Sequence, residues 1–128
     1  MSSINTKIDP YHLVEIKPNS FLFEIKNALT ADICQEMINR FESCKDDQYP
    51  GRVGQGAEEE LSIKRSTDLV LSGKEHLKDL DRYLFHSMGL ALQEFRKQYG
   101  YFKGPFKDMG YAIQRTNPGE HYHWHIDG

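Results

Sequence analysis

A run of alternating histidines near residue 128 constrains this chain more than any other feature. Three histidines and an aspartate alternate with aromatic or aliphatic residues, in the order His121, Tyr122, His123, Trp124, His125, Ile126 and Asp127. Successive side chains of an extended strand point to opposite faces, so this spacing predicts the histidines and the aspartate together on one face. Neutral imidazole and carboxylate groups are ligands for divalent metal ions. The run therefore predicts a metal-binding strand, with Trp124 packed into the core on its other face.

The residues just before this run predict a second strand and a tight turn. Residues 109–116 (MGYAIQRT) are rich in β-forming residues, and Asn117-Pro118-Gly119 is a strong turn signal. Because alternate residues of a strand share a face, Gln114 and Thr116 are expected on one face and Arg115 on the other. Gln114 and Thr116 are therefore the polar candidates of this strand for a site.

Two amphipathic helices are predicted earlier in the chain. Thr30 offers a hydroxyl cap, and apolar residues at helical spacing after it predict a helix over about 31–44. A longer apolar stripe predicts a helix over 74–99. Short apolar stretches at 11–16 and 21–25 predict two strands or an extended arm, and the charged, glycine-containing segment 45–60 predicts an exposed loop.

Composition and charge narrow the class of protein. Hydrophobic residues make up 38% of the chain and charged residues 27%, which is typical of a folded globular domain. A net charge of -3 offers no long-range attraction for nucleic acid. The first residues are polar and contain no signal-peptide core, and no stretch is long enough to span a membrane. We therefore expect one α+β domain in the cytoplasm, with neither nucleic acid nor membrane as a partner.

The remaining candidate ligands are interpreted as structural. Cys34 and Cys44 are too far apart for a CxxC motif, and we expect them to be reduced thiols. His76 and His86 lie on the predicted long helix without a ligand-type residue one turn away, so we expect both to be surface or packing residues.

The segment from Tyr111 to Asp127 resembles the first barrel strands of the 2-oxoglutarate and iron(II)-dependent dioxygenases, in their prolyl-4-hydroxylase-like branch. In that branch a strand, a Pro-Gly or similar turn, a tyrosine three residues before a histidine, and a His-x-Asp motif occur in this order. Lys26–Cys34 is similar to the start of the family's first helix, and Lys64–Asp68 is similar to its Arg-x-Ser-type segment. The resemblance extends over about residues 21–127.

The resemblance implies a fold. It predicts amino-terminal helices packed on the first strands of a double-stranded β-helix, a jelly-roll or cupin-like barrel that is incomplete within these 128 residues. Residues 1–20 would form an extended arm, 21–107 a helical support region, and 108–128 the first barrel strands with the His-x-Asp motif. All of this would belong to one partial dioxygenase domain.

The resemblance also implies a site. His125 and Asp127 match the first two iron ligands, and Tyr122 matches a tyrosine that lines the catalytic site near the substrate. Many prolyl hydroxylases bind 2-oxoglutarate with a tyrosine nine residues before the ligand histidine, and Thr116 stands at this position here. Gln114 is the second candidate for contact with 2-oxoglutarate. The implied cofactors are Fe(II) and 2-oxoglutarate, with ascorbate as an additional reductant.

The implied reaction is hydroxylation of a C–H bond by dioxygen, in a protein or peptide side chain or in a small molecule. The family's third ligand and its 2-oxoglutarate-anchoring Arg or Lys lie several strands after His-x-Asp, so we expect them beyond residue 128. The chain as given would then be inactive alone and could self-associate through an exposed strand edge.

Three other interpretations stay open. The histidine run could be a solvated surface strand. It could also be a non-catalytic zinc or nickel site built from the alternating histidines and Asp127. The whole chain could be a metal-binding remnant or binding module that oxidises nothing.

Overall fold

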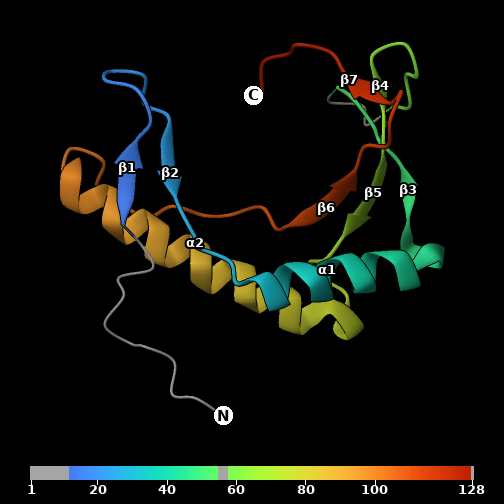
Figure 1. Ribbon diagram of the computed structural model, residues 1–128, viewed down its shortest axis with the longest axis horizontal. Coiled ribbons are helices and arrows are strands. Elements are labelled where there is room, and N and C mark those ends of the chain that lie inside the picture. The colour runs from blue at the N-terminus through green and yellow to red at the C-terminus, as the bar shows by residue number, and fades with distance from the viewer. Residues whose placement is uncertain (1–11, 55–57, 128) are drawn as a thin grey trace. The chain divides into compact units, whose positions relative to one another are not determined.

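The computed structural model describes residues 12–54 and 58–127 (Figure 1). Its contacts divide the chain into two compact units. The first unit holds residues 12–34 and 82–108, and the second holds 35–81, apart from 55–57, and 109–127. Parts of the predicted arm (1–11) and of the predicted loop (55–57), and residue 128, lie outside the described residues.

The first unit contains a β-hairpin. Strand β1 (Leu13–Glu15) pairs antiparallel with β2 (Phe23–Ile25), as Figure 1 shows. The Glu15 carboxylate accepts hydrogen bonds from the backbone N–H groups of Asn19 (3.1 Å) and Phe21 (2.9 Å). The two apolar stretches are therefore short strands, and Glu15 fixes the turn between them.

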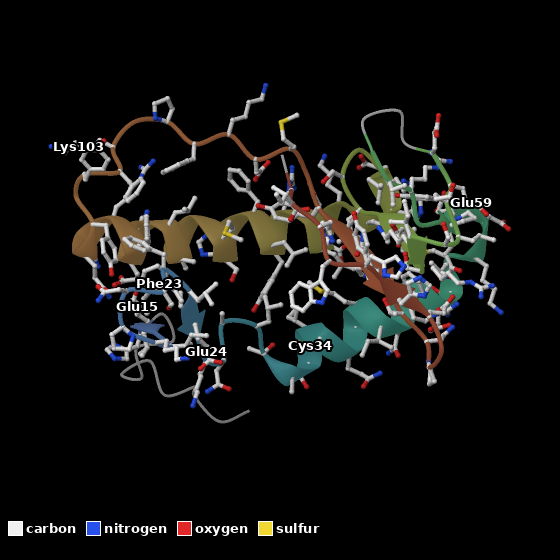
Figure 2. All side chains as sticks on the ribbon, turned by 90° about the horizontal axis from the view of Figure 1, so that it is seen from above. Glu15, Phe23, Glu24, Cys34, Glu59 and Lys103 are labelled. Carbon is white, nitrogen blue, oxygen red and sulfur yellow. The ribbon has the colours of Figure 1, made fainter. Side chains whose placement is uncertain are left out.

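Aromatic packing attaches this hairpin to helix α2 (Lys78–Gln98). Phe23, labelled in Figure 2, lies with its ring 5.4 Å from the ring of Phe95 and 5.4 Å from that of Tyr99. The Gln98 side chain donates a hydrogen bond to the Leu13 carbonyl oxygen at 3.2 Å. Edge-to-face ring contacts of this kind add to the stabilisation from buried area.

Both predicted helices are confirmed. Helix α1 spans Ala31–Ser43, and the Thr30 hydroxyl accepts a hydrogen bond from the Ile33 N–H at 3.3 Å, as expected for a capping residue. A short 3-10 helix, η2 (Glu75–Leu77), leads directly into α2. Together η2 and α2 cover almost all of the predicted range 74–99.

The second unit holds the remaining strands, which form two small antiparallel sheets. These elements are η1 (Lys45–Asp47), β3 (Tyr49–Pro50), β4 (Lys64–Arg65), β5 (Thr67–Val70), β6 (Ala112–Arg115) and β7 (His121–Tyr122). One sheet has the order β3-β5-β6, and the other pairs β4 with β7. The predicted strand at 109–116 is confirmed by β6. The predicted loop at 45–60 begins instead with η1 and β3, because Tyr49 and Pro50 pair with β5.

The core of the second unit is aliphatic and aromatic. Its buried hydrophobic residues are Met37, Phe41, Leu69, Leu71, Leu77 and Leu80. Arg115 of β6 lies with its guanidinium 5.2 Å from the ring of Phe41 and forms an ion pair with Glu42 at 3.1 Å. Arg115 therefore lies against α1, on the opposite face of β6 from Gln114, as the alternation predicted.

The mixed α+β class is confirmed. The strands that residues 12–54 and 58–127 form are short and close no barrel. The predicted boundaries at residues 20 and 107 stay predictions, as does the single domain. Cys34 and Cys44 are free thiols, as expected. Within the described part of the chain, neither helix has the length and apolar character that a membrane span requires.

Candidate metal-binding site

The histidine run is not one continuous strand, so the predicted alternation of faces is wrong beyond His123. Strand β7 covers only His121 and Tyr122, and the chain bends at Trp124. The last backbone hydrogen bond of this pairing runs from the His123 N–H to the Ile63 carbonyl oxygen, at 2.9 Å. Alternation requires extended backbone, and the ladder that would keep the backbone extended stops here.

The bend brings together two side chains that were predicted on opposite faces. The Tyr122 ring stacks on the His125 ring, with centroids 3.7 Å apart and planes 10° apart. His121 and His123 still lie on one side, with ring centroids 4.8 Å apart. His121 Nε2 lies 3.2 Å from the Ser62 carbonyl oxygen. This nitrogen therefore donates a hydrogen bond to the backbone and is not available as a metal ligand.

The prediction that Trp124 is a core residue is also wrong. Its side chain is fully exposed, as is that of Ile126. Both residues follow the end of the strand pairing, so they do not take the positions in a strand that would have placed their side chains in the core. Within residues 12–54 and 58–127, the apolar face expected behind the histidines is therefore uncovered.

His125 and Asp127 are arranged as a pair of ligands to one ion would be. The Nε2 atom of His125 lies 3.1 Å from Oδ1 of Asp127. The other ring nitrogen, Nδ1, lies 2.7 Å from the His123 carbonyl oxygen. A carbonyl can only accept, so Nδ1 donates to it, which leaves Nε2 as the ring nitrogen that faces the Asp127 carboxylate. Metal-ligating histidines are commonly oriented by such a second hydrogen bond.

A buried polar network lies behind this pair. Lys64 and Asp68 are each 4% exposed, and Ser66 between them is also buried. The Lys64 ammonium donates to Oδ2 of Asp68 at 3.3 Å, and the Ser66 hydroxyl donates to Oδ1 at 2.8 Å. The Gln114 amide donates to Oδ2 of Asp68 at 3.2 Å, from the facing position on β6. We call these four side chains the Lys64–Asp68 network.

Tyr122 connects this network to the ligand pair. In the pairing of β4 with β7, Tyr122 stands directly opposite Lys64, and the Lys64 ammonium lies 4.8 Å from the centre of the Tyr122 ring. A cation at this distance is attracted by the ring face. Tyr122 thus contacts Lys64 and also stacks on His125, so the network can hold the orientation of the histidine.

The contacts bring most of the sequence-predicted site together. They run through six side chains in this order: Gln114, Asp68, Lys64, Tyr122, His125 and Asp127. Thr116, the other predicted 2-oxoglutarate contact, lies exposed just after β6 and takes no part in these contacts. Lys64, Ser66 and Asp68 were not predicted as site residues from the sequence. The three residues alternate along a segment that is flanked by apolar residues, and alternate residues of a strand share a face. This alternation was the signal that could have predicted a shared polar face.

The charge of the network affects Tyr49, which pairs with Asp68 across β3 and β5. Burial raises the pKa of Tyr49 above its usual value of 10.0, and the negative charge of Asp68 raises this pKa further. Arg52, whose guanidinium lies 4.9 Å from the Tyr49 ring, opposes this shift. Tyr49 is therefore a partly buried phenol that lies next to the Asp68 carboxylate.

A third protein ligand for His125 and Asp127 is absent from the described part of the chain. The only group of three His, Cys, Asp or Glu donors close enough to share an ion there is Cys44, Asp47 and His76. A hollow of about 440 Å³ in this unit is lined by residues that include Arg65, Thr67 and Glu120, and not by the ligand pair. The described residues thus bring two candidate ligands together at His-x-Asp.

Comparison with known proteins adds no family: the chain matches no protein-family model, no curated protein and no solved structure. The resemblance to the dioxygenases therefore rests on the residues described above and stays a prediction.

Proposed function

We propose that this chain contributes two iron ligands, His125 and Asp127, to an Fe(II)- and 2-oxoglutarate-dependent oxygenase. The observation that carries the proposal is the ligand pair itself. Nε2 of His125 and Oδ1 of Asp127 lie 3.1 Å apart, and Nδ1 is engaged by a backbone carbonyl. One imidazole and one carboxylate are two members of the two-His-one-carboxylate set that leaves open positions on non-haem iron(II).

Each neighbouring side chain has a defined part in this proposal. Tyr122 packs on the His125 ring and keeps its Nε2 atom directed at Asp127. The Lys64–Asp68 network holds Tyr122 from behind. Gln114 and Thr116 remain the candidates for contact with 2-oxoglutarate. When bound, iron(II) with 2-oxoglutarate and dioxygen supplies the oxidising chemistry that hydroxylates a C–H bond.

The proposal includes the finer fold and the substrate class. Strands β6 and β7 would be the first strands of a jelly-roll barrel whose later strands carry the third ligand, a histidine. The substrate would be a protein or peptide side chain, and ascorbate would maintain the iron in its reduced form. The family resemblance supports each of these three points.

A second candidate function is metal binding without catalysis. The observation in its favour is that the described residues bring only two donors together at His-x-Asp, and that the Asp127 side chain is 94% exposed. A divalent ion held in this way would keep most of its positions for water. This candidate and the oxygenase share the ligand pair and differ only in turnover.

Turnover separates the two candidates. The coding frame should be read past Gly128, and the form of the protein that it specifies should be assayed for succinate formed from 2-oxoglutarate with Fe(II), dioxygen and ascorbate. The oxygenase predicts succinate formation that Asp127→Ala abolishes and that His121→Ala, the matched control, leaves in place. No succinate from any form of the protein would refute the oxygenase and leave metal binding alone.

A further inference from the structure

The second unit holds another group of ligand-type side chains, far in sequence from the histidine run. Cys44 follows the last residue of α1, Asp47 ends η1, and His76 lies in η2. The Cys44 sulfur, a carboxylate oxygen of Asp47 and a ring nitrogen of His76 all lie within 4.8 Å of one another. We propose that these three residues form a second metal site, which takes Zn²⁺ or a similar borderline divalent ion.

The donor set decides the class of ion. A thiolate, an imidazole and a carboxylate are all zinc ligands, and three protein ligands with one open position are typical of zinc sites that retain a water. A soft sulfur ligand disfavours magnesium and calcium, which take oxygen ligands. This site is therefore chemically distinct from the His-x-Asp pair, which contains no sulfur.

The geometry brings the three donors close enough to share one ion. Nε2 of His76 lies 2.8 Å from Oδ2 of Asp47. The Cys44 sulfur lies within 4.8 Å of a carboxylate oxygen of Asp47 and of a ring nitrogen of His76. Donor atoms at these separations need only a small adjustment of side-chain rotamers to contact one ion.

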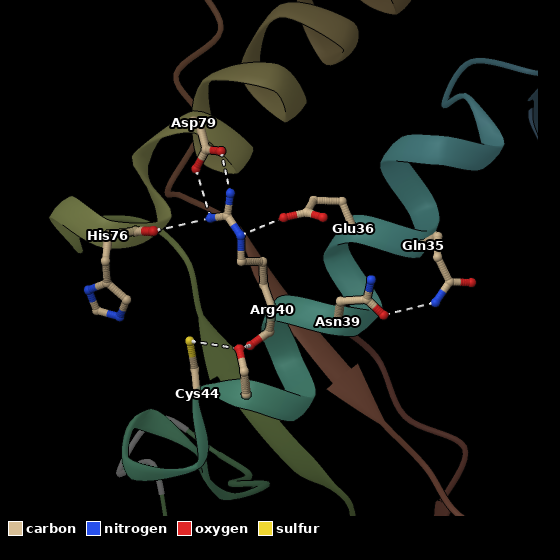
Figure 3. Close-up of polar contacts among 8 residues, drawn as sticks. Gln35, Glu36, Asn39, Arg40, Cys44, His76 and Asp79 are labelled. Atoms are coloured by element: carbon tan, nitrogen blue, oxygen red, sulfur yellow. Dashed lines mark hydrogen bonds and ion pairs between the residues drawn. The ribbon is translucent and has the colours of Figure 1, made fainter.

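Arg40 fixes two of the segments that carry these donors. Its guanidinium donates to both carboxylate oxygens of Asp79, at 3.1 and 2.8 Å, and to the backbone carbonyl of His76 at 3.2 Å (Figure 3). Its Nε atom also donates to Glu36 of the same helix at 2.7 Å. Arg40 thereby ties η2 to the last turns of α1, next to Cys44, before any ion binds.

The electrostatic setting favours a cation. Cys44 follows the carboxyl end of α1, where the unpaired carbonyls carry partial negative charge. In η1 the two acidic side chains of Asp46 and Asp47 outnumber the one basic side chain of Lys45. Cys44 and Asp47 are partly buried, and the His76 side chain is 54% exposed, so an ion can enter from solvent.

The test uses Co²⁺ as a spectroscopic probe with the reduced full chain. A thiolate bound to Co²⁺ gives an intense ligand-to-metal charge-transfer absorption, which oxygen and nitrogen ligands do not give. We expect this absorption in the wild-type chain and its loss in Cys44→Ser. Cys34→Ser is the matched control and should keep the absorption, since Cys34, within α1, is the other free thiol of the chain. Asp47→Asn and His76→Gln should weaken Zn²⁺ competition for the site at least about tenfold.

A second measurement uses only the wild-type chain, so folding of the variants cannot confuse it. Zn²⁺ should slow alkylation of Cys44 while leaving that of Cys34 unchanged, as measured by mass spectrometry of the two peptides. Equal alkylation rates with and without Zn²⁺, or charge-transfer absorption that survives Cys44→Ser, would overturn the proposal. Asp127→Ala should leave both results unchanged, so failure at this site is distinguishable from failure at the His-x-Asp pair.

Discussion

Replacing Lys64 by methionine tests the network that supports the candidate site. Lys64→Met removes the ammonium group and its charge and leaves an unbranched side chain that is one atom shorter. Both partners of the Lys64–Asp68 pair have side chains only 5% exposed, so solvent screens their attraction weakly. The substitution leaves the Asp68 carboxylate buried with hydrogen bonds from Ser66 and Gln114 but without its cation.

The size of the effect follows from this environment. Removing one partner of a buried ion pair costs about 3–5 kcal/mol, because an uncompensated charge stays buried. Two hydrogen bonds to Asp68 remain, so we expect the lower end, about 3 kcal/mol. With a urea m-value of about 1.5–2 kcal/mol/M, the unfolding midpoint should fall by roughly 1.5–2 M.

Urea unfolding followed by circular dichroism measures this loss, and two further variants interpret it. Lys107→Met, at an exposed position, is the control and should stay within about 0.5 kcal/mol of wild type. Adding Asp68→Asn to Lys64→Met removes the unpaired charge and should recover a large part of the stability, which a double-mutant cycle quantifies. If Lys64→Met lowers the free energy of unfolding no more than Lys107→Met does, the result would refute the stabilising role of the buried pair.

Three further predictions concern other contacts of the second unit. The hydrogen bonds from Arg40 lower the pKa of Asp79 below its usual 3.8, so this carboxylate stabilises the fold above that pH and the contribution is lost as pH falls through the lowered pKa. Asp79→Asn should therefore reduce the free energy of unfolding by up to about 1 kcal/mol at about pH 7 and should lose this effect at about pH 2. Urea unfolding at both pH values measures the effect, and an equal loss of stability at the two pH values would contradict the prediction. A Cβ on Gly51 would lie 2.2 Å from the Ser66 hydroxyl and 2.7 Å from Cε of Lys64, so Gly51→Ala should cost about 1–3 kcal/mol in thermal unfolding, and a neutral result would contradict the packing. Spectrophotometric titration should find Tyr49 ionising above its usual 10.0, and Asp68→Asn should lower this pKa, whereas a pKa unchanged by Asp68→Asn would contradict the contact.

The helices were the most predictable part of the fold, because their signals are local. The Thr30 cap and the apolar spacing after it define α1 within one residue of its observed end. The apolar stripe predicted a helix over 74–99, and η2 and α2 together span 75–98, within one residue at each end. Hydrogen bonds within a helix join residues four apart, so nearby sequence contains most of the information that sets its bounds.

The strand with the histidines was harder to predict, because its length depends on a partner. Alternation was applied through Asp127, but β4 offers backbone pairing only as far as His123. The stacking of Tyr122 on His125 and the exposure of Trp124 both follow from the bend after that point. The ligand pair was still found, since His125 and Asp127 are close in sequence and need no distant partner.

Groups assembled from distant segments were missed altogether. Cys44 was interpreted as a structural thiol because its distance from Cys34 does not fit a CxxC motif, and His76 was interpreted as a surface or packing residue of the long helix. They meet because Arg40 ties η2 to α1, and this contact between distant residues has no local signature. The contact of Lys64 with Tyr122 depends in the same way on the pairing of β4 with β7.

The most direct test of the His-x-Asp site is to titrate the chain with Mn²⁺, a paramagnetic substitute for Fe(II), and to follow the histidine ring signals by NMR. We expect the His125 signals to broaden first, and His125→Ala or Asp127→Ala to weaken that binding at least about tenfold, whereas His121→Ala should not. Broadening that spares His125, or that persists unchanged in Asp127→Ala, would contradict the proposed ligand pair and with it the oxygenase.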